Sequence, residues 1–459
     1  MQLKILHTND VHSNFDNFSK ITSIINKVKD DNTLILDAGD FTDFKNIALQ
    51  GTKGQAGTEL LNIAGYDAAS IGNNETFALL PTLEYMASNS KVPYLSLNLT
   101  KEDGSRISGV NSSIIVEKAG LKILLIGLSP DLGPFNSLLE FHLKDYNEAI
   151  KEELNKNIGK YDLVILVDHI GTERDFSIAQ EIPGIDIIIS SHDHKLFQKA
   201  KTVNETIINS AGEYGEHLGY IIVDYNGSGL SLIDSGVISS KDEQKNELIL
   251  ASLRENNIIA RKNLSSPLYF IDKSLTHDNI EENPICNLIA DGLRDLLKCE
   301  IGLINGGICN GGIKEGPVTD LKLIEICPSP LNPSSFNIKG KDLRQALEDS
   351  LDGSNCLKEG KGAGFRGRFV GKLHLSGGEI YYSDDKIEKI LINGSPLEDE
   401  KLYSIASTDY LQRGSGYESL NKNLDTSYRA EYIRDIIRTY GEMQNFRDNS
   451  FIERWKKIK

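Results

Sequence analysis

The sequence predicts an α/β protein with more than one domain, and three observations support this prediction. Short apolar, β-branched runs recur over the first 240 residues, at 3–6, 33–36, 67–71, 121–127, 162–167 and 186–190. Stretches of helical composition, such as residues 18–29 and 143–158, separate several of them. Apolar strands that alternate with helices are typical of a sheet covered on both faces. A chain of 459 residues also suffices for two to four domains, at roughly 100–200 residues each.

The rest of the chain continues this pattern. Residues 218–234 alternate in polarity around an NGSG turn and predict a hairpin that closes the first domain. Residues 241–263 contain no Gly or Pro and many charges, which predicts a helix that connects two domains. In the second α/β region, 287–298 and 343–351 have helical spacing and IGLIN is strand-like. Residues 353–367, rich in Gly, Lys and Arg, are expected to form a surface loop.

The composition excludes several classes of protein. Hydrophobic residues make up 39% of the chain and charged residues 25%, as in soluble globular proteins. No apolar run approaches the roughly 18 residues of a membrane-spanning helix. With 66 acidic and 50 basic residues the net charge is −16, which argues against nucleic-acid polymers and membranes as partners. The five cysteines form no CxxC pair, and no signal peptide is visible, so we expect a cytoplasmic protein.

Potential metal ligands follow five of the early strands. Ligands bind at the carboxyl ends of strands in open α/β sheets, so these side chains are expected to converge. Their oxygen and nitrogen donors suit Mn, Zn, Fe or Co. Taken singly, a DxH or HxH pair is more often a surface pair, and Asn-Asn after Gly is more often a turn. Five such clusters favour a metal site; they are Asp10 and His12, Asp37 and Asp40, Asn73 and Asn74, Asp168 and His169, and His192 and His194.

The spacing within these clusters also suits metal binding. Residues two apart on an extended chain point the same way, so Asp10 and His12 can face one ion, as can His192 and His194. Gly39 and Gly72 stand directly before ligand residues, where they permit tight turns.

The order DxH, GD, GN-x-E, a strand-end His and HxH resembles the calcineurin-like metallophosphatases, and more narrowly the bacterial 5′-nucleotidase family. The segments HTNDVHS, AGEYGEHLG, NPICNLIADGLRD and NGGICNGGIKEGPVT occur in family order. The resemblance implies a four-layer α/β/β/α metallophosphatase sandwich over residues 1–240, a linker helix over 241–263, and a smaller α/β nucleotide-binding domain over 264–459.

The resemblance also implies a ligand set for two divalent metal ions. One ion would be held by Asp10, His12, Asp40 and His194, and the other by Asp40, Asn73, His169 and His192, with Asp40 bridging. Two such ions can clamp the attacking and leaving oxygens of a phosphoryl transfer. The implied reaction is attack of a metal-bound hydroxide on the phosphorus of a nucleotide or related phosphorylated small molecule.

The sequence departs from the family at the expected general acid. Family members usually read GNHE-x-D, whereas Asn74 stands here at the His position and Phe77 at the Asp position. Asn can contact the transition state, but it cannot protonate a leaving group. General acid catalysis is typically worth about 10²–10⁴-fold, so poor leaving groups should suffer most. His7 and His217 are expected to be structural rather than replacements.

The second domain departs from the family as well. Asn310 stands at the position of the phosphate-binding Arg, and Ser415 at that of a ribose-binding Asp, while Asn305 and Asn332 are retained. Phe369 and Tyr410 are the best counterparts of the two aromatics that sandwich the base. Basic residues nearby are candidates to replace the missing Arg: Lys361, Arg366, Arg368 and Arg413.

The expected function is therefore hydrolysis of nucleotides, of the 5′-nucleotidase kind, with 2′,3′-cyclic phosphodiesterase or nucleotide pyrophosphatase activity as variants. One alternative is a metallophosphatase or phosphodiesterase whose substrate carries no base. Another is a slow nucleotide-binding or sensor protein, motivated by the missing His–Asp pair and Arg.

Overall fold

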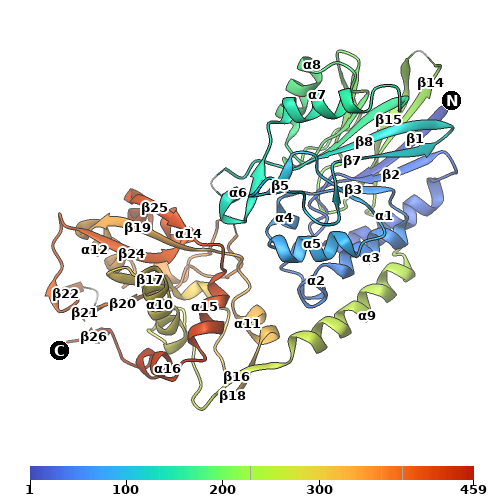
Figure 1. The fold of residues 1–459 in the computed structure, drawn as a ribbon. Coiled ribbons are helices and arrows are strands. Elements are labelled where there is room, and N and C mark those ends of the chain that lie inside the picture. The colour runs from blue at the N-terminus through green and yellow to red at the C-terminus, as the bar shows by residue number, and fades with distance from the viewer. Residues whose placement is uncertain (134, 228, 363, 385, 459) are drawn as a thin grey trace. The chain divides into compact units, whose positions relative to one another are not determined.

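In the computed structural model, each of the apolar runs named above forms a strand. The structure describes residues 1–133, 135–227, 229–362, 364–384 and 386–458 (Figure 1). The chain divides into two compact units, Met1–Asn263 and Leu264–Lys459. Within the described residues, no helix is long and apolar enough to span a membrane.

Two mixed sheets form the centre of the first unit. One has the order β15 (Leu230–Ser239), β14 (His217–Tyr225), β1 (Gln2–Thr8), β2 (Thr33–Asp37), β3 (Ala68–Ser70), β4 (Tyr94–Leu95), β6 (Val110–Asn111). The other has the order β12 (Lys201–Val203), β13 (Thr206–Asn209), β11 (Ile187–Ile189), β10 (Leu163–Asp168), β8 (Leu121–Leu128), β7 (Ser113–Lys118). β5 (Leu99–Lys101) and β9 (Phe141–Leu143) pair separately.

Alternate residues of these strands belong to different cores, which explains why the runs are apolar throughout. Leu34 and Leu36 of β2 pack between the two sheets together with Ile165 and Val167 of β10. Ile35, between the two leucines, points instead to the helices outside its sheet. Since both faces of each strand are buried, every position favours an apolar side chain.

Helices cover the outer face of each sheet and complete four layers. One outer layer contains α1 (Phe15–Val28), α2 (Ile47–Thr52), α3 (Gln55–Ala64) and α5 (Leu80–Ser88), and the other α7 (Tyr146–Lys156) and α8 (Thr172–Glu181) (Figure 1). Two single-turn helices, α4 (Asn73–Thr76) and α6 (Phe135–Leu138), lie in connections. The predicted α/β/β/α sandwich is confirmed.

The charged segment after the hairpin forms α9 (Glu247–Leu264), which begins six residues later than the predicted 241. The Asn246 side chain accepts hydrogen bonds from the amides of Leu248 and Ile249, so it caps the helix there. α9 packs on the first unit: Asn256 Nδ2 donates to Glu59 Oε2 at 2.8 Å. The helix ends at the boundary between the two units.

The second unit is a smaller α/β domain around one core. Its largest sheet has the order β20 (Leu373–Ser376), β17 (Ile301–Asn305), β24 (Leu402–Thr408), β19 (Pro333–Lys339), β25 (Leu424–Tyr428). A second has the order β23 (Ser395–Pro396), β22 (Lys386–Ile392), β21 (Gly378–Ser383), β26 (Trp455–Lys457), and β16 (Pro267–Ile271) pairs with β18 (Gly316–Thr319). The helices are α10 (Pro284–Leu297), α11 (Asp320–Ile326), α12 (Gly340–Asp349), α13 (Gly353–Cys356), α14 (Asp409–Gln412), α15 (Ile433–Tyr440) and α16 (Gln444–Ser450).

The expected surface loop over 353–367 is only partly correct. Its first residues form α13, and the side chains of Cys356 and Phe365 are buried in the unit, whereas Arg366 is exposed. Two buried anchors therefore hold a segment whose composition alone predicts solvent exposure. Residue 363 of this stretch lies outside the described residues, as does residue 228 of the predicted hairpin turn.

Candidate metal centre

The predicted metal ligands all follow strands of the first unit at one edge of its two sheets. β1, β2 and β3 run parallel, as do β10 and β11, so the carboxyl ends within each set lie together. The residues after these strands are Asp10 and His12, Asp40, Asn73, His169, and His192 and His194.

The loops that carry these ligands have an unusual backbone. Asp10, His12, Asp40, His192 and His194 all have positive φ, between 49° and 82°. Outside glycine, this conformation costs about 1–3 kcal/mol per residue, and such residues cluster at functional sites. Main-chain hydrogen bonds hold it in place, since the amides of Asp10 and His12 donate to the carbonyls of Gly39 (3.0 Å) and Asp40 (2.8 Å).

The two glycines act differently from each other. Gly39 has φ of +91°, which suits the predicted turn. Gly72 has an ordinary φ of −91°, but a Cβ there would stand 2.1 Å from Asp40 Oδ1. The absent side chain at Gly72 thus makes room for a ligand.

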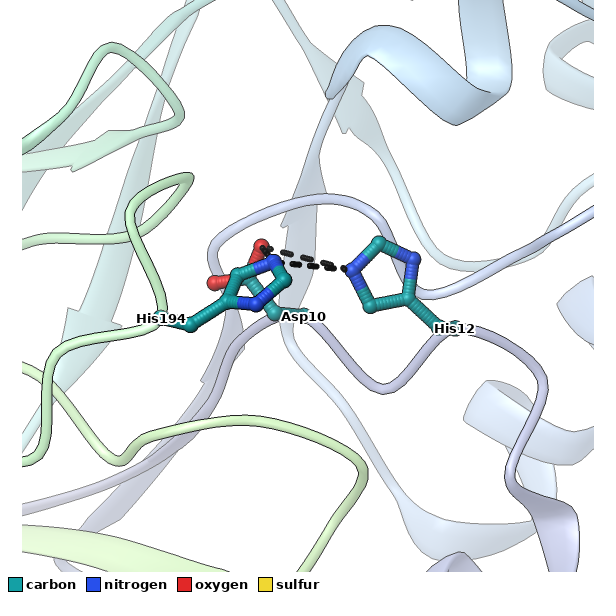
Figure 2. Close-up of side chains that lie close together, drawn as sticks. All are labelled: Asp10, His12 and His194. Atoms are coloured by element: carbon teal, nitrogen blue, oxygen red, sulfur yellow. Dashed lines mark hydrogen bonds and ion pairs between the residues drawn. The ribbon is translucent and has the colours of Figure 1, made fainter. Parts of the chain in front are cut away.

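Two overlapping groups of side chains could each hold an ion. In Asp10, His12 and His194, and again in Asp10, Asp40 and His169, the potential ligand atoms lie within 4.8 Å of one another. Figure 2 shows the Asp10 carboxylate and the rings of His12 and His194 turned toward one another, the first two from one loop and His194 from another. His194 Nε2 lies 3.4 Å from Asp10 Oδ1 and 3.2 Å from His12 Nε2.

Asp40 faces both groups. Its Oδ2 lies 3.4 Å from His169 Nε2 and 3.8 Å from His12 Nε2. Asp10 Oδ1 is also 3.8 Å from His169 Nε2, so both carboxylates are central to the cluster. The bridging role of Asp40 stays a prediction from the family resemblance.

Asn73 and His192 complete the set on the His169 side. Asn73 Oδ1 lies 3.1 Å from His192 Nδ1, and the His169 and His192 ring centroids are 5.0 Å apart. The His192 amide donates to Asp10 Oδ2 at 3.1 Å, which ties this loop to the other carboxylate. The structure therefore brings all seven predicted ligands together.

The electrostatics of the cluster fit divalent cations. Asp10 Oδ1 and His169 Nε2 are buried and have no hydrogen-bond partner among the described residues, so both stand ready as ligands. Burial alone lowers the pKa of His169, but the charge of Asp40 outweighs it and raises that pKa to about 10. The same carboxylates that favour a proton on His169 would favour a divalent cation in place of that proton.

Two other imidazoles, those of His12 and His192, favour the form that binds metals. Burial lowers the pKa of His12 and of His192, which favours neutral rings with a free lone pair. The pKa of Asp40 lies below its usual range because the nearby charge of His169 outweighs the burial of the carboxyl. An ionised carboxylate and neutral imidazoles are the donors that these metals bind.

Asn74, at the family's His position, is tied to a ligand. Its Nδ2 donates to Asp40 Oδ2 at 2.6 Å and lies 3.2 Å from His12 Nδ1. Its main-chain amide donates to Asp40 Oδ1 at 2.8 Å. Phe77 packs against the core of the first unit. The predicted contact of Asn74 with a transition state requires its amide to turn from Asp40 toward the substrate.

The sequence motifs assign no role to Glu75 or Ser191, although Glu75 is the last residue of the GN-x-E motif. Glu75 is fully buried, and its carboxylate accepts hydrogen bonds from the amides of Asp40, Thr42 and Gly72. A Glu three residues after Gly72, at the start of a helix, is a capping signal that was available in the sequence. Ser191 Oγ lies 2.7 Å from His169 Nδ1, and no sequence pattern pointed to it. His7 is buried within β1, as expected of a structural residue.

The predicted substrate residues lie in the second unit, and several have structural partners. Asn305 is fully buried and donates to the Val370 carbonyl, and Asn332 donates to the carbonyls of Ala430 and Glu431. Arg413 forms an ion pair with Asp409 at 2.9 Å. Arg366 donates to the Phe365 carbonyl, and Arg368 lies 4.8 Å over the Phe369 ring.

The two aromatics predicted to bind the base have different neighbours in the structure. Tyr410 is fully buried and stacks on Phe365, with ring centroids 4.4 Å apart and an interplanar angle of 20°. Phe369, half-buried, lies next to Arg368 instead. Phe365 lies in the segment that was expected to be a surface loop.

A cavity of about 620 Å³ opens beside Tyr410 and the turn at 414–416. Carboxylates outnumber amines in its lining, which disfavours a phosphate there. The charged lining residues are Glu348, Asp349, Asp352, Glu359 and Glu418 against Lys358 and Lys361.

Family comparisons assign a class to each unit. The calcineurin-like phosphoesterase family matches residues 3–196, which carry the Asp/His cluster. The 5′-nucleotidase C-terminal domain family matches residues 262–422. Together with the sandwich fold, these matches define a metal-dependent phosphoric ester hydrolase.

Individual relatives agree with this class. The uncharacterized metallophosphoesterase YunD of Bacillus subtilis is 30% identical over 454 residues, or 95% of this chain and 98% of that protein. The trifunctional nucleotide phosphoesterase protein YfkN of the same organism is 25% identical, over 76% of this chain and 27% of that protein. The NAD nucleotidase structure from Haemophilus influenzae shares the fold, with a TM-score of 0.65, 15% identity and full coverage of both chains. The chain belongs to the 5′-nucleotidase family of calcineurin-like metallophosphoesterases.

Proposed function

We propose that this protein is a dinuclear metallophosphohydrolase that acts on nucleotides. The observation that carries the proposal is the convergence of seven oxygen and nitrogen donors on one edge of the sandwich, with Asp10 and Asp40 at the centre. One ion would be held by Asp10, His12, Asp40 and His194, and the other by Asp40, Asn73, His169 and His192. The donor set suits Mn, Zn, Fe or Co.

When bound, two such cations would polarise the phosphoryl group and acidify the attacking water. The chain's own contribution is to fix the ligands before substrate arrives. Asn74 holds the Asp40 carboxylate through two hydrogen bonds. Ser191 and the Ala38 carbonyl hold His169 Nδ1, so that Nε2 faces Asp40.

The substrate preference follows from Asn74. Since an amide cannot donate a proton to a departing alkoxide, a nucleoside monophosphate gains nothing from general acid catalysis at this position. A leaving group that is itself a phosphate, or a more acidic alcohol, departs with less need of protonation. We therefore propose a preference among substrates. The kcat/KM for pyrophosphate-linked or cyclic nucleotides, relative to that for monophosphates, is higher here than is usual in the family. The name of YfkN, a trifunctional nucleotide phosphoesterase, supports a nucleotide substrate.

The decisive experiment is a phosphate-release panel with the full-length protein. Nucleoside monophosphates, 2′,3′-cyclic nucleotides, dinucleotides and sugar phosphates are each tested with Mn²⁺, Zn²⁺, Co²⁺ and Mg²⁺. We expect metal-dependent turnover, with cyclic or pyrophosphate-linked nucleotides among the best substrates. Fastest release from AMP would count against the leaving-group argument. Nucleotide-dependent thermal stabilisation without turnover for any metal would favour the sensor alternative.

A second candidate, a phosphatase whose substrate carries no base, is favoured by the burial of Tyr410 against Phe365. On this alternative Phe369→Ala and Tyr410→Ala leave the saturation constant for the best substrate unchanged. If a nucleotide substrate stacks on either ring, removing that ring should raise the saturation constant several-fold, since base stacking is worth about 1–3 kcal/mol.

A further inference from the structure

The two nitrogens of His194 face different partners. Nε2 points into the metal cluster, 3.4 Å from Asp10 Oδ1. Nδ1, on the other side of the ring, lies 2.6 Å from Glu213 Oε2. Glu213 is not among the predicted ligands and lies nineteen positions further along the chain. The Glu213 carboxylate therefore lies in contact with the ring nitrogen that turns away from the cluster.

The main chain on both sides of Glu213 is anchored at the metal centre. The Gly212 amide donates to the Lys195 carbonyl, next to His194, at 3.0 Å. The Tyr214 amide donates to the Asp10 carbonyl at 2.7 Å. Glu213 therefore starts from a backbone fixed to two of the ligand loops, although its side chain is 35% exposed. This arrangement distinguishes it from an ordinary surface ion pair, whose partners are free to separate.

A second ligand imidazole, which is fully buried, is held differently. His169 Nδ1 lies 2.9 Å from the Ala38 carbonyl and 2.7 Å from Ser191 Oγ, and both of these groups are neutral. Of these two ligand rings, His194 is therefore the one with a carboxylate against the nitrogen that turns away from the cluster.

We propose that Glu213 is a positioning residue of the metal centre. It accepts the Nδ1–H of His194, which fixes the tautomer, leaves the lone pair on Nε2 facing the ion, and adds negative charge behind the ring. Removing such a partner typically weakens metal affinity about 10–100-fold. The inference builds on the proposed dinuclear centre and adds that the ion on the His12–His194 side depends on Glu213.

The test is Mn²⁺ binding to the full-length, metal-stripped protein by titration calorimetry. Glu213→Gln keeps the size of the side chain and removes its charge. We expect one of two Mn²⁺ sites to weaken about 10–100-fold, while the other keeps its wild-type affinity. Glu216→Gln, an exposed carboxylate on the same loop, is the matched control and should bind both ions as the wild type does.

A second variant and a second readout separate positioning from folding. The melting temperature of the metal-free protein should be the same for the wild type and Glu213→Gln. Glu213→Asp keeps the charge and should recover part of the lost affinity. Wild-type affinity at both sites in Glu213→Gln would overturn the inference, as would equal weakening of both sites. Failure of the wild type itself to bind Mn²⁺ would instead overturn the proposed metal centre.

Discussion

Glu75 holds the backbone of Asp40: its Oε2 accepts the Asp40 amide at 3.0 Å, deep inside the first unit. The same oxygen accepts the Gly72 amide at 2.9 Å, and Oε1 accepts the Thr42 amide at 2.9 Å. One carboxylate therefore joins the loop after β2 to the loop after β3. The positions of Asp40 and Asn73 both depend on it.

Glu75→Gln should disturb this junction although it changes few atoms. An amide NH₂ would face N–H donors, which leaves buried groups unsatisfied at a cost of about 1–3 kcal/mol. We expect a lower free energy of unfolding in urea and weaker Mn²⁺ binding. Glu102→Gln, at an exposed position of the same unit, serves as the control. Wild-type stability and affinity in Glu75→Gln would refute this account.

Asp40→Gly should abolish binding of both ions. Gly is chosen because Asp40 has φ of +52°, which Gly adopts without strain, so that only the side chain is lost. The measurement is metal content per chain after dialysis against Mn²⁺. Asp31→Gly, at an exposed position before β2, should keep the wild-type content. Two ions per chain in Asp40→Gly would exclude a bridging role for Asp40.

Asn74→His should raise activity selectively. An imidazole can protonate a leaving group, so hydrolysis of nucleoside monophosphates should increase by up to about 10²-fold, the lower end of general acid catalysis, while that of pyrophosphate-linked nucleotides changes little. The lower end is expected because Phe77 replaces the family's Asp and gives the new His no carboxylate partner. Comparing kcat/KM for both substrate types checks this prediction. An equal change for both would show that Asn74 acts through Asp40, to which it donates.

His374 should make the second unit sensitive to acid. It is fully buried, its Nδ1 lies 3.0 Å from the Lys372 carbonyl, and its Nε2 faces two N–H donors of Asn283. Burial lowers its pKa to about 3. The unfolded chain takes up a proton near pH 6.5, well before the folded protein does. The contribution of His374 to the free energy of unfolding is therefore complete above pH 6.5. It falls toward pH 3 by about 1.4 kcal/mol per pH unit.

Urea unfolding at pH 7 and pH 5 measures this effect. The only tryptophan, Trp455, reports on the second unit because its Nε1 donates to the Leu373 carbonyl, beside His374. His374→Gln retains an acceptor for Asn283 and does not titrate. Between pH 7 and pH 5 its free energy of unfolding should therefore fall by about 2 kcal/mol less than that of the wild type. Equal losses would show that other groups dominate.

Much of the first unit could be predicted from the sequence because its strands are buried on both faces. Such strands leave continuous apolar runs, and the ligands stand at their ends, as at Asp10 and His192. The start of α9 was predicted too early because composition does not distinguish the turn before Asn246 from the helix that Asn246 caps. Local sequence could not reveal Glu213 or Ser191, since their partners lie far away in the chain or depend on how the strands are arranged.

The second unit was less predictable for a related reason. Phe365 lies among Gly, Lys and Arg, and its burial against Tyr410 depends on tertiary packing rather than on local periodicity. Arg413, by contrast, pairs with Asp409 one helical turn away, a contact that the local spacing of the two residues permits.

The left-handed backbone of the ligand residues has a cost in folding free energy. At Asp10, His12, Asp40, His192 and His194 the fold holds conformations that glycine would adopt more easily. The side chains that would bind the ions are therefore kept at the expense of stability. Glycine at these positions would relieve the strain in the metal-free protein.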